Sequence, residues 1–294
     1  MIERIIGVVG GSGFYQMPGL TDVREVQVDT PFGPPSDALV RGRLGDTTLL
    51  FLPRHGRGHR LTPSQINYRA NVFALKQLGA QAIISVSACG SMREELGVGH
   101  VVIVDQFFDR TRARADSYFD CGVAAHVQFA DPVCADLAGL LHDAAVGLRL
   151  PVRRGGTYLC MEGPAFSTRA ESRIYRQWGV DVIGMTNIPE AKLAREAELC
   201  YATIAIPTDY DCWHDEHADV DVAAILKALR ENVQRAQAII REAVPRIGLP
   251  RPCACARALD DALITDVKAI PADVRERLAP LLGRVLAARG EGKS

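Results

Sequence analysis

The sequence has 294 residues, of which 48% are hydrophobic and 23% charged, an ordinary composition for a globular protein. The formal net charge of −1 gives no electrostatic sign of nucleic-acid binding, and no apolar run is long enough to span a bilayer. The first residues, Met1–Ile6, lack the layout of a signal peptide and lead directly into a predicted strand, so we expect a cytoplasmic protein.

Apolar runs of strand length alternate with helical patterns along the chain. The predicted strands are Ile5–Val9, Thr48–Leu52, Ala82–Val86, Val101–Val104, Val180–Ile183 and Tyr201–Ile206. The predicted helices run from Thr62 to Gly79, from Thr168 to Gly179, over Pro189–Glu198 and from Ile225 to Val244, and the first two begin at capping boxes. This alternation favours one α/β domain over residues 1–249, with a central, mostly parallel mixed sheet flanked by helices.

A break in the pattern follows at Gly248–Pro252. We expect residues 250–294 to form a helical extension packed on the body of the domain, with helices over Ala258–Val267 and Ala272–Ala288. The last residues, Gly290–Ser294, are predicted to be disordered.

The eight cysteines are scattered, with no CxxC pair and no Cys/His group at zinc spacing, so the sequence predicts no metal site. Cys253 and Cys255 are interpreted as two free thiols, because a redox pair is not expected in a reducing cytoplasm. Cys89 has no base beside it in the sequence and is interpreted as a buried structural thiol rather than a nucleophile.

Polar or glycine-rich segments follow four of the predicted strands. They are Gly10–Gly13, Arg54–His59, Ser87–Ser91 and Gly184–Thr186. Backbone N–H groups, hydroxyls and guanidinium forks are the donors that bind phosphate, so these strand ends together predict an anion site. Taken alone, the first segment is equally a tight turn and the third is better explained by close packing, whereas the place of the arginines after a buried strand favours a binding role for the second. The first is neither a dinucleotide fingerprint nor a Walker loop, which disfavours a nucleotide-dependent dehydrogenase.

A pair of carboxylates, Asp209 and Asp211, follows the strand Tyr201–Ile206. In an extended segment residues two apart face the same way, so the pair would accept from donors in one plane, such as the N7–H and 6-amino group of a purine. A solvated turn is the alternative interpretation. Phe166 could stack on such a base, although a lone aromatic before a helix more often packs in the core or as a hydrophobic staple. A base site beside an anion site indicates displacement at a sugar carbon by phosphate.

The chain resembles the S-methyl-5′-thioadenosine phosphorylase family of the purine nucleoside phosphorylase superfamily, over about residues 4–245. The matching blocks are Val8–Gly13, Asp29–Gly33, Pro35–Ala38, Arg54–Arg57, Asn67–Asn71, Ala88–Ser91, Asp105–Phe107, Glu162–Pro164, Ser167–Glu171 and Thr208–Trp213. Two positions depart from the family pattern: Ser87 stands where the family usually has Thr, and Gly184 stands where animal members have Asn.

The resemblance implies a role for each matching residue. The residues implied for phosphate binding are Ser12, Arg54, His55, Ser87, Ala88 and Thr186. The residues implied for nucleoside binding are Phe166, Met185, Asp209, Asp211, Val222, Ile225 and, from a neighbouring subunit, His126. Asp209 and Asp211 are also implied as the catalytic pair, with phosphate as co-substrate and no cofactor. The family assembles as a trimer, so a homotrimer or a dimer of trimers is expected.

The implied reaction is reversible phosphorolysis of methylthioadenosine to adenine and 5-methylthioribose 1-phosphate. Asp209, if protonated, would act as general acid toward purine N7. The first alternative is phosphorolysis of a 6-oxopurine nucleoside or of methylthioinosine, which two acceptor carboxylates disfavour because a C6 carbonyl needs a donor. The second is a nucleoside-binding protein without catalysis, which has no need of phosphate groups beside the sugar.

Overall fold

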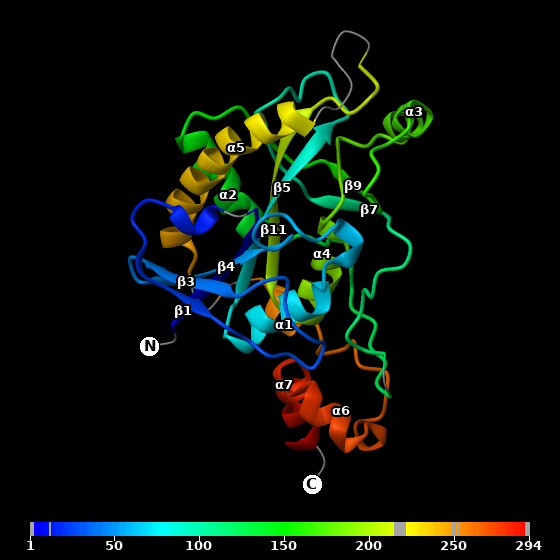
Figure 1. Ribbon diagram of the computed structural model, residues 1–294. Helices are drawn as coiled ribbons and strands as arrows, with labels where there is room; N and C mark the ends of the chain where they lie inside the picture. Colours follow the sequence, from blue (N-terminus) through cyan, green and yellow to red (C-terminus); the bar gives the residue numbers. More distant parts are fainter. Residues whose placement is uncertain are drawn as a thin grey trace.

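The computed structural model describes residues 3–11, 13–120, 122–214, 222–248, 251 and 253–291, without the side chains of 222–230 and 291. One large sheet runs through the molecule with helices around it (Figure 1). The strands are β1 Arg4–Gly10, β2 Thr21–Val26, β3 Leu39–Leu44, β4 Thr47–Pro53, β5 Ala82–Ser91, β6 Val101–Ile103, β7 Gln106–Arg110, β8 Val152–Arg154, β9 Thr157–Met161, β10 Val182–Gly184 and β11 Cys200–Asp209. The helices are α1 Tyr68–Gln77, α2 Ala135–Gly147, α3 Arg169–Gln177, α4 Asn187–Glu196, α5 Val222–Ala243, α6 Ala272–Arg277 and α7 Ala279–Glu291.

The sheet is mixed and mostly parallel, which confirms the fold class predicted from the alternation of elements. Its main path is β2-β3-β4-β1-β5-β10-β9-β7, and β11 lies beside β5 and β6. Strand β1 is parallel to β4 and β5, and β5 is parallel to β11. These four strands are buried along nearly their whole length, as expected of parallel strands covered by helices on both faces.

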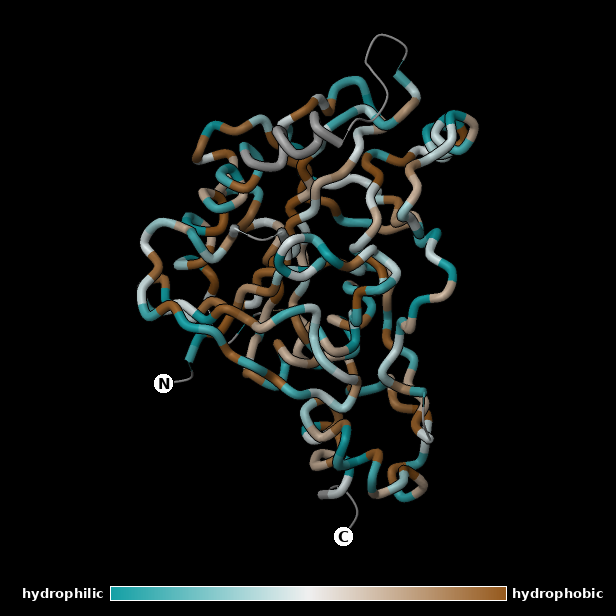
Figure 2. Tube along the Cα trace, in the orientation of Figure 1, coloured by the Kyte–Doolittle hydropathy of each residue, from teal (hydrophilic) through white to brown (hydrophobic). Residues whose placement is uncertain are grey.

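Two large apolar clusters fill the space between the sheet and the helices. One contains residues of α1, α4 and α7, such as Phe73, Leu193 and Leu282, and the other contains residues of α2 and α5, such as Leu141 and Ile239. Figure 2 shows the hydrophobic residues concentrated along the strands in the middle of the molecule. None of the helices in the described part of the chain is long and apolar enough to cross a membrane.

The helix predicted from Thr62 to Gly79 is divided in two. A 3-10 turn covers Pro63–Gln65, and α1 starts only at Tyr68, where the Asn67 side chain accepts a hydrogen bond from the Ala70 N–H at 3.1 Å. The chain has a second capping residue inside the predicted helix, so the first capping box serves only the short turn. The capping box at Thr168 opens α3 as predicted.

The C-terminal extension differs in detail from its prediction. No α-helix forms over 258–267: turns connect the 3-10 segments Ala254–Arg257 and Val267–Ala269. The region predicted as one helix over 272–288 is divided into α6 and α7. Helix α7 reaches Glu291, so the predicted disorder does not begin at residue 290. Residues 292–294 and the predicted domain boundary at 249–250 lie outside the described residues. Leu278, Leu281 and Leu282 of the extension are buried in the same cluster as residues of α1.

Candidate active site

The parallel strands β1, β4, β5 and β11 end at one edge of the sheet, and the predicted site residues of these strands gather there. The N–H of Arg54, directly after β4, donates to Gly10 O at the end of β1 at 2.9 Å. Asp209 ends β11 opposite Gly90 of β5, where the register shifts. Ser12, predicted in the loop after β1, lies outside the described residues. Ligands bind at this edge in open α/β sheets.

Arg54 is buried, with 3% of its surface exposed, and its guanidinium group forms a bidentate salt bridge with the carboxylate of Glu190. Nε and Nη2 donate to the two carboxylate oxygens at 2.8 and 2.9 Å, and Nη2 also donates to Ser85 Oγ. Nη1 donates to Val86 O at 3.1 Å, so one Nη1 hydrogen has no acceptor among the described residues. Because Glu190 accepts from both Nε and Nη2, a phosphate ion cannot bind the same edge of the guanidinium, and the predicted phosphate contact of Arg54 would use Nη1.

His55 is half-buried and uncharged at neutral pH. Burial lowers the pKa of its ring to about 4. Its Nδ1 lies 2.9 Å from Leu61 O, and since a carbonyl oxygen only accepts, Nδ1 carries the hydrogen and Nε2 remains an acceptor. The ring stacks on His59 with centroids 4.1 Å apart. His55 can therefore accept a hydrogen bond from a protonated phosphate oxygen but does not attract the anion as a cation.

Ser87 lies in the middle of β5 and contacts Tyr158 of β9. Ser87 Oγ lies 2.9 Å from the hydroxyl of Tyr158, and Ala88 is exposed although its neighbours in the strand are buried. A Cβ added to Gly184 would lie 1.8 Å from the same Tyr158 hydroxyl. Tyr158 thus fills the space of a side chain at position 184, which explains why glycine stands there in this chain.

Thr186 is the N-cap of α4, and its side chain makes no capping hydrogen bond. It is buried, with 6% of its surface exposed, two residues after the end of β10. Ile188 within α4 has non-helical backbone angles, φ −113° and ψ 128°, so the regular helix begins only after it. The Thr186 hydroxyl can donate to an anion, and its contact with phosphate stays a prediction.

Asp209 and Asp211 lie together, but not by the extended geometry expected from their spacing. Asp211 has a φ of 53°, and its backbone N–H donates to Asp209 Oδ1 at 2.8 Å, so the chain turns after the strand. Both side chains pack over Gly90, where an added Cβ would come within 3.0 Å of Asp209 Oδ1 and 3.3 Å of Asp211 Cβ. Burial raises the pKa of both carboxyl groups, and the charge of Asp211 raises that of Asp209 further.

Thr208 is the remaining polar contact of Asp209. Its Oγ1 lies 2.7 Å from Asp209 Oδ2 and 3.3 Å from Cys89 O. A hydroxyl both donates and accepts, so Thr208 can donate to the ionised carboxylate or accept from the protonated acid while donating to Cys89 O. Burial raises the pKa of the Cys89 thiol well above its usual range, which agrees with a structural thiol rather than a nucleophile.

The remaining predicted residues are placed less directly: Phe166 lies next to Ser167, whose carbonyl accepts from Cys212 Sγ at 3.3 Å, while no described contact brings His126 to this edge. Phe166 is 46% exposed in the loop before α3. His126 is exposed, and its segment is tied to the C-terminal extension, because its N–H donates to Ala262 O at 2.8 Å. Figure 1 draws the extension and the end of β5 at opposite ends of the molecule. The side chains of Val222 and Ile225 lie outside the described residues.

Arg114 and Glu190 support the site but were missed in the sequence analysis. The Arg114 side chain is 2% exposed and donates at 2.7 Å each to the carbonyls of Glu162, Met185 and Ile188. It thereby ties the loop around Glu162 to the loop carrying Met185. No sequence pattern near either residue indicates its role, because the partners of both are distant in sequence. Only the structure shows that both are charged side chains buried beside the site.

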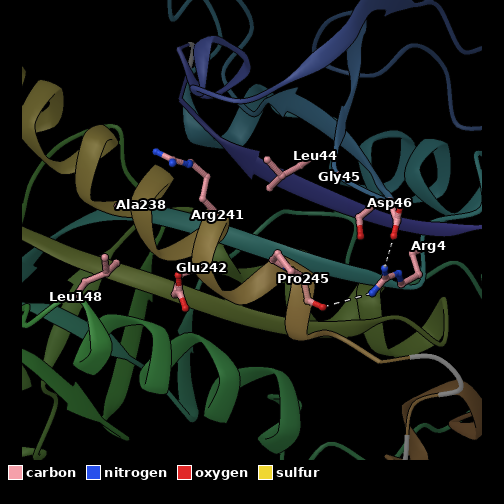
Figure 3. A pocket seen from close by; sticks show the side chains of 10 residues that line it. Arg4, Leu44, Gly45, Asp46, Leu148, Ala238, Arg241, Glu242 and Pro245 are labelled. Carbon is pink, nitrogen blue, oxygen red and sulfur yellow. Dashed lines mark hydrogen bonds and ion pairs between the residues drawn. The ribbon is translucent and has the colours of Figure 1, made fainter.

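A surface cavity at the other edge of the sheet was also considered as a site (Figure 3). Its lining includes Arg4, the first residue of β1, and Asp46, directly before β4. Arg4 Nη2 lies 4.0 Å from Asp46 Oδ2, and Arg4 Nη1 donates to Pro245 O at 3.5 Å. None of the predicted site residues lines this cavity, so we place the candidate active site at the carboxyl ends of the strands.

Comparison with known proteins identifies the family of the chain. The family model for the phosphorylase superfamily matches residues 5–245. The chain belongs to the phosphorylase superfamily. The S-methyl-5′-thioadenosine phosphorylase of Geobacter sulfurreducens is 62% identical over 283 residues, which cover 96% of this chain and 99% of that protein. The protein of the same name from Koribacter versatilis is 52% identical, over 96% of this chain and 97% of its own.

Solved structures of superfamily members match the fold closely. A methylthioadenosine phosphorylase from an antarctic soil metagenomic library superimposes with a TM-score of 0.90 at 47% identity, covering 96% of this chain and all of that one. The methylthioadenosine phosphorylase of Schistosoma mansoni, in complex with adenine, gives a TM-score of 0.80 at 36% identity, covering 95% and 98% of the two chains. These coverages extend beyond the 5–245 region, so both relatives include counterparts to much of the C-terminal extension.

Proposed function

We propose that this chain catalyses phosphate-dependent cleavage of S-methyl-5′-thioadenosine to adenine and 5-methylthioribose 1-phosphate. Its superfamily and its 62% identity to a relative of that name support this activity. The observation that carries the proposal is the buried carboxyl pair Asp209 and Asp211, whose pKa values burial raises, at the edge where Arg54 and Ser87 also lie. A departing purine needs an acid that stays protonated, and the attacking anion needs donors beside it.

The proposed chemistry is displacement at the anomeric carbon of the ribose. A phosphate oxygen forms the new bond to this carbon as the bond to purine N9 breaks, and the electron pair of the broken bond moves into the purine. Asp209 donates its proton to N7 and leaves neutral adenine. Thr208, which hydrogen-bonds Asp209 in either protonation state, holds the acid in place through the transfer.

We assign phosphate binding to Ser12, Arg54, His55, Ser87, Ala88 and Thr186. Arg54 offers its one remaining Nη1 hydrogen, and since Glu190 balances its charge, binding depends mostly on neutral donors. His55 accepts from a protonated phosphate oxygen through Nε2. Thr186 adds its hydroxyl, which makes no capping hydrogen bond.

We assign nucleoside binding to Phe166, Met185, Asp209, Asp211, Val222 and Ile225. Asp211 would accept from the 6-amino group of adenine, and Met185 would lie against the ribose. Arg114 fixes the Met185 carbonyl and thereby the loop that would contact the sugar. Val222 and Ile225 are assigned to the methylthio pocket from the family resemblance.

We propose further that the enzyme is a cytoplasmic homotrimer in which His126 completes the site of a neighbouring subunit. His126 is exposed on a segment tied to the extension, away from Asp209 of its own chain. An aromatic pair, Phe108 and Trp178, is also 41% and 52% exposed, with ring centroids 5.3 Å apart. Light scattering after size exclusion tests the assembly: a trimer is expected, and Trp178→Glu should reduce its association if this pair lies in the interface.

The activity is tested by adenine release from methylthioadenosine with and without phosphate, with methylthioinosine run in parallel. Phosphate-dependent release of adenine and little hypoxanthine are expected. Release without phosphate would indicate a hydrolase, and a preference for methylthioinosine would contradict the roles of Asp209 and Asp211. Binding of methylthioadenosine without any turnover would indicate a nucleoside-binding protein.

A further inference from the structure

Four cysteines that are scattered in the sequence meet in one cluster on the far side of the molecule from Asp209. They are Cys134, Cys200, Cys253 and Cys255. Their sulfur atoms all lie within 4.8 Å of one another, and three of the four residues are buried. All four are free thiols. No other group of three or more metal-ligating side chains forms in the part of the chain that the structure describes.

The cluster joins three separate parts of the fold. Cys134 is the N-cap of α2, and Cys200 is the first residue of β11. At the start of the C-terminal extension, Cys253 is the N-cap of the 3-10 turn Ala254–Arg257 and Cys255 lies within it. Because β11 runs from Cys200 to Asp209, the cluster lies at one end of this strand and the candidate active site at the other.

The spacing of the sulfur atoms is close to that of a tetrahedral thiolate site. A Zn–S distance of about 2.3 Å puts the sulfurs of a regular tetrahedron about 3.8 Å apart. The sulfur atoms of Cys200 and Cys253 are 3.2 Å apart, and no two of the four sulfurs are more than 4.8 Å apart. A disulfide needs about 2.0 Å, so no pair is at bonding distance. The separation of a regular site thus lies between the 3.2 Å of this pair and the 4.8 Å limit of the cluster.

A positively charged group with an unused donor lies beside the cluster. Arg251 lines the same small cavity as Cys134, Cys200 and Cys253. Its Nη1 is buried and has no hydrogen-bond partner in the described part of the chain. A zinc ion bound by four thiolates carries two net negative charges, and such sites are held by N–H donors to their sulfurs. The N-terminus of α2, at Cys134, favours negative charge at the same place.

We propose that the four cysteines bind one Zn²⁺ ion as a closed, structural site. Binding replaces four thiol protons, which are released to solvent, by one divalent cation, with no change of oxidation state. Four protein ligands leave no open position, so the ion takes no part in the reaction. Its role is to fasten the C-terminal extension to the start of β11 and to α2. The sequence shows no zinc spacing because Cys200 and Cys253 are 53 residues apart.

The test uses the full chain, purified under reducing conditions without chelator, and measures zinc by mass spectrometry together with thiol content. One zinc per chain is expected, with release of the metal when a mercurial reagent titrates the thiols. The same protein loaded with Co²⁺ should show the thiolate-to-metal charge-transfer and visible bands of tetrahedral cobalt. Removal of the zinc should lower the thermal unfolding midpoint while adenine release well below that temperature continues.

Cys253→Ser should lose most of the zinc, whereas the matched control Cys212→Ser, outside the cluster, should keep it. If Cys253→Ser fails to fold, metal content of the wild type still decides the matter. Four reduced thiols that take up no zinc when it is added would overturn the proposal. Disulfides among these cysteines would overturn the proposal as well. They would appear, in protein isolated with its free thiols trapped, as an intact mass lower by two hydrogens for each cysteine pair.

Discussion

The pairing of Arg54 with Glu190 predicts how the protein should respond to Glu190→Gln. The two side chains are 3% and 1% exposed, so the substitution leaves a buried guanidinium without its anion. Removing one partner of a buried pair costs about 3–5 kcal/mol of unfolding free energy. The amide oxygen of Gln can still accept one of the two hydrogen bonds and recover about 1 kcal/mol. We therefore expect a loss of about 2–4 kcal/mol, or roughly 5–15 °C in the thermal midpoint.

Phosphate distinguishes this effect from a simple packing defect. In the variant the guanidinium has a free N–H and an unbalanced positive charge next to the proposed phosphate site, so phosphate becomes its partner. A ligand at a hundredfold excess over its dissociation constant stabilises a folded protein by about 2.7 kcal/mol. If the variant binds phosphate more tightly than the wild type, the same phosphate concentration stabilises the variant more. Scanning calorimetry over a phosphate series should show a larger rise of the midpoint for Glu190→Gln than for the wild type.

Glu196 on the same helix provides the control. It is also buried, but it accepts from Tyr118 N–H and Ser117 Oγ, and burial raises its pKa to about 7. Glu196→Gln removes no ion pair, so the response of its midpoint to phosphate should match the wild type. The proposed link between the ion pair and the phosphate site is refuted by either of two results. One is a thermal midpoint of Glu190→Gln equal to that of the wild type, and the other is an equal shift of these two midpoints by phosphate.

Three further predictions concern single residues of the site. Asp209→Asn should lower turnover about 10²–10⁴-fold without unfolding the protein, and should remove the fall in rate at alkaline pH that follows deprotonation of the acid; near-normal turnover would exclude Asp209 as the acid. Burial lowers the pKa of His55 to about 4 in the folded protein. The unfolded state therefore binds more protons than the folded state between about pH 6.5 and about pH 4. As the pH falls through this range, the unfolding free energy of the wild type should drop by up to ~3 kcal/mol relative to that of His55→Gln. Denaturant titrations across this range measure the difference, and parallel profiles would contradict it. Gly184→Ala should destabilise by about 1–3 kcal/mol because the added methyl meets the Tyr158 hydroxyl, whereas Gly147→Ala, where a Cβ meets nothing within 4 Å, should not.

Local signals in the sequence predicted much of the site. Arg54 and Asp209 follow buried apolar strands, and parallel strands bring their carboxyl ends to one edge, so these positions follow from the pattern alone. The partners of Arg54 do not follow, because Glu190 lies 136 residues away. The turn at Asp211 could not be read from the spacing either, since a positive φ at a non-glycine residue depends on its neighbours.

The wrong helix over 258–267 shows how a tertiary contact overrides a helical pattern. Leu259, Ala262 and Leu263 have helical spacing and are buried as a helix would bury them. Leu263 instead forms a bridge with Ala125, and the N–H of Leu259 donates to Glu198 Oε1 at 3.1 Å. Several backbone groups that a helix would satisfy internally therefore bond to other parts of the domain, as Ile264 N–H does to Ala124 O. By contrast, α2 has the apolar spacing of an amphipathic helix and was missed although its signal was present.

The register of β11 links stability at one end of the strand to chemistry at the other. Tyr201, one residue after Cys200, donates to Glu190 Oε1 at 2.9 Å, and Glu190 in turn orients Arg54. A slip of one residue would turn Tyr201 to the other face and move Asp209 off Gly90. The proposed zinc site holds Cys200, at the end of β11 that takes no part in the catalytic chemistry. By fixing the register of this strand, a structural ion far from Asp209 would still help to keep the candidate active site in place.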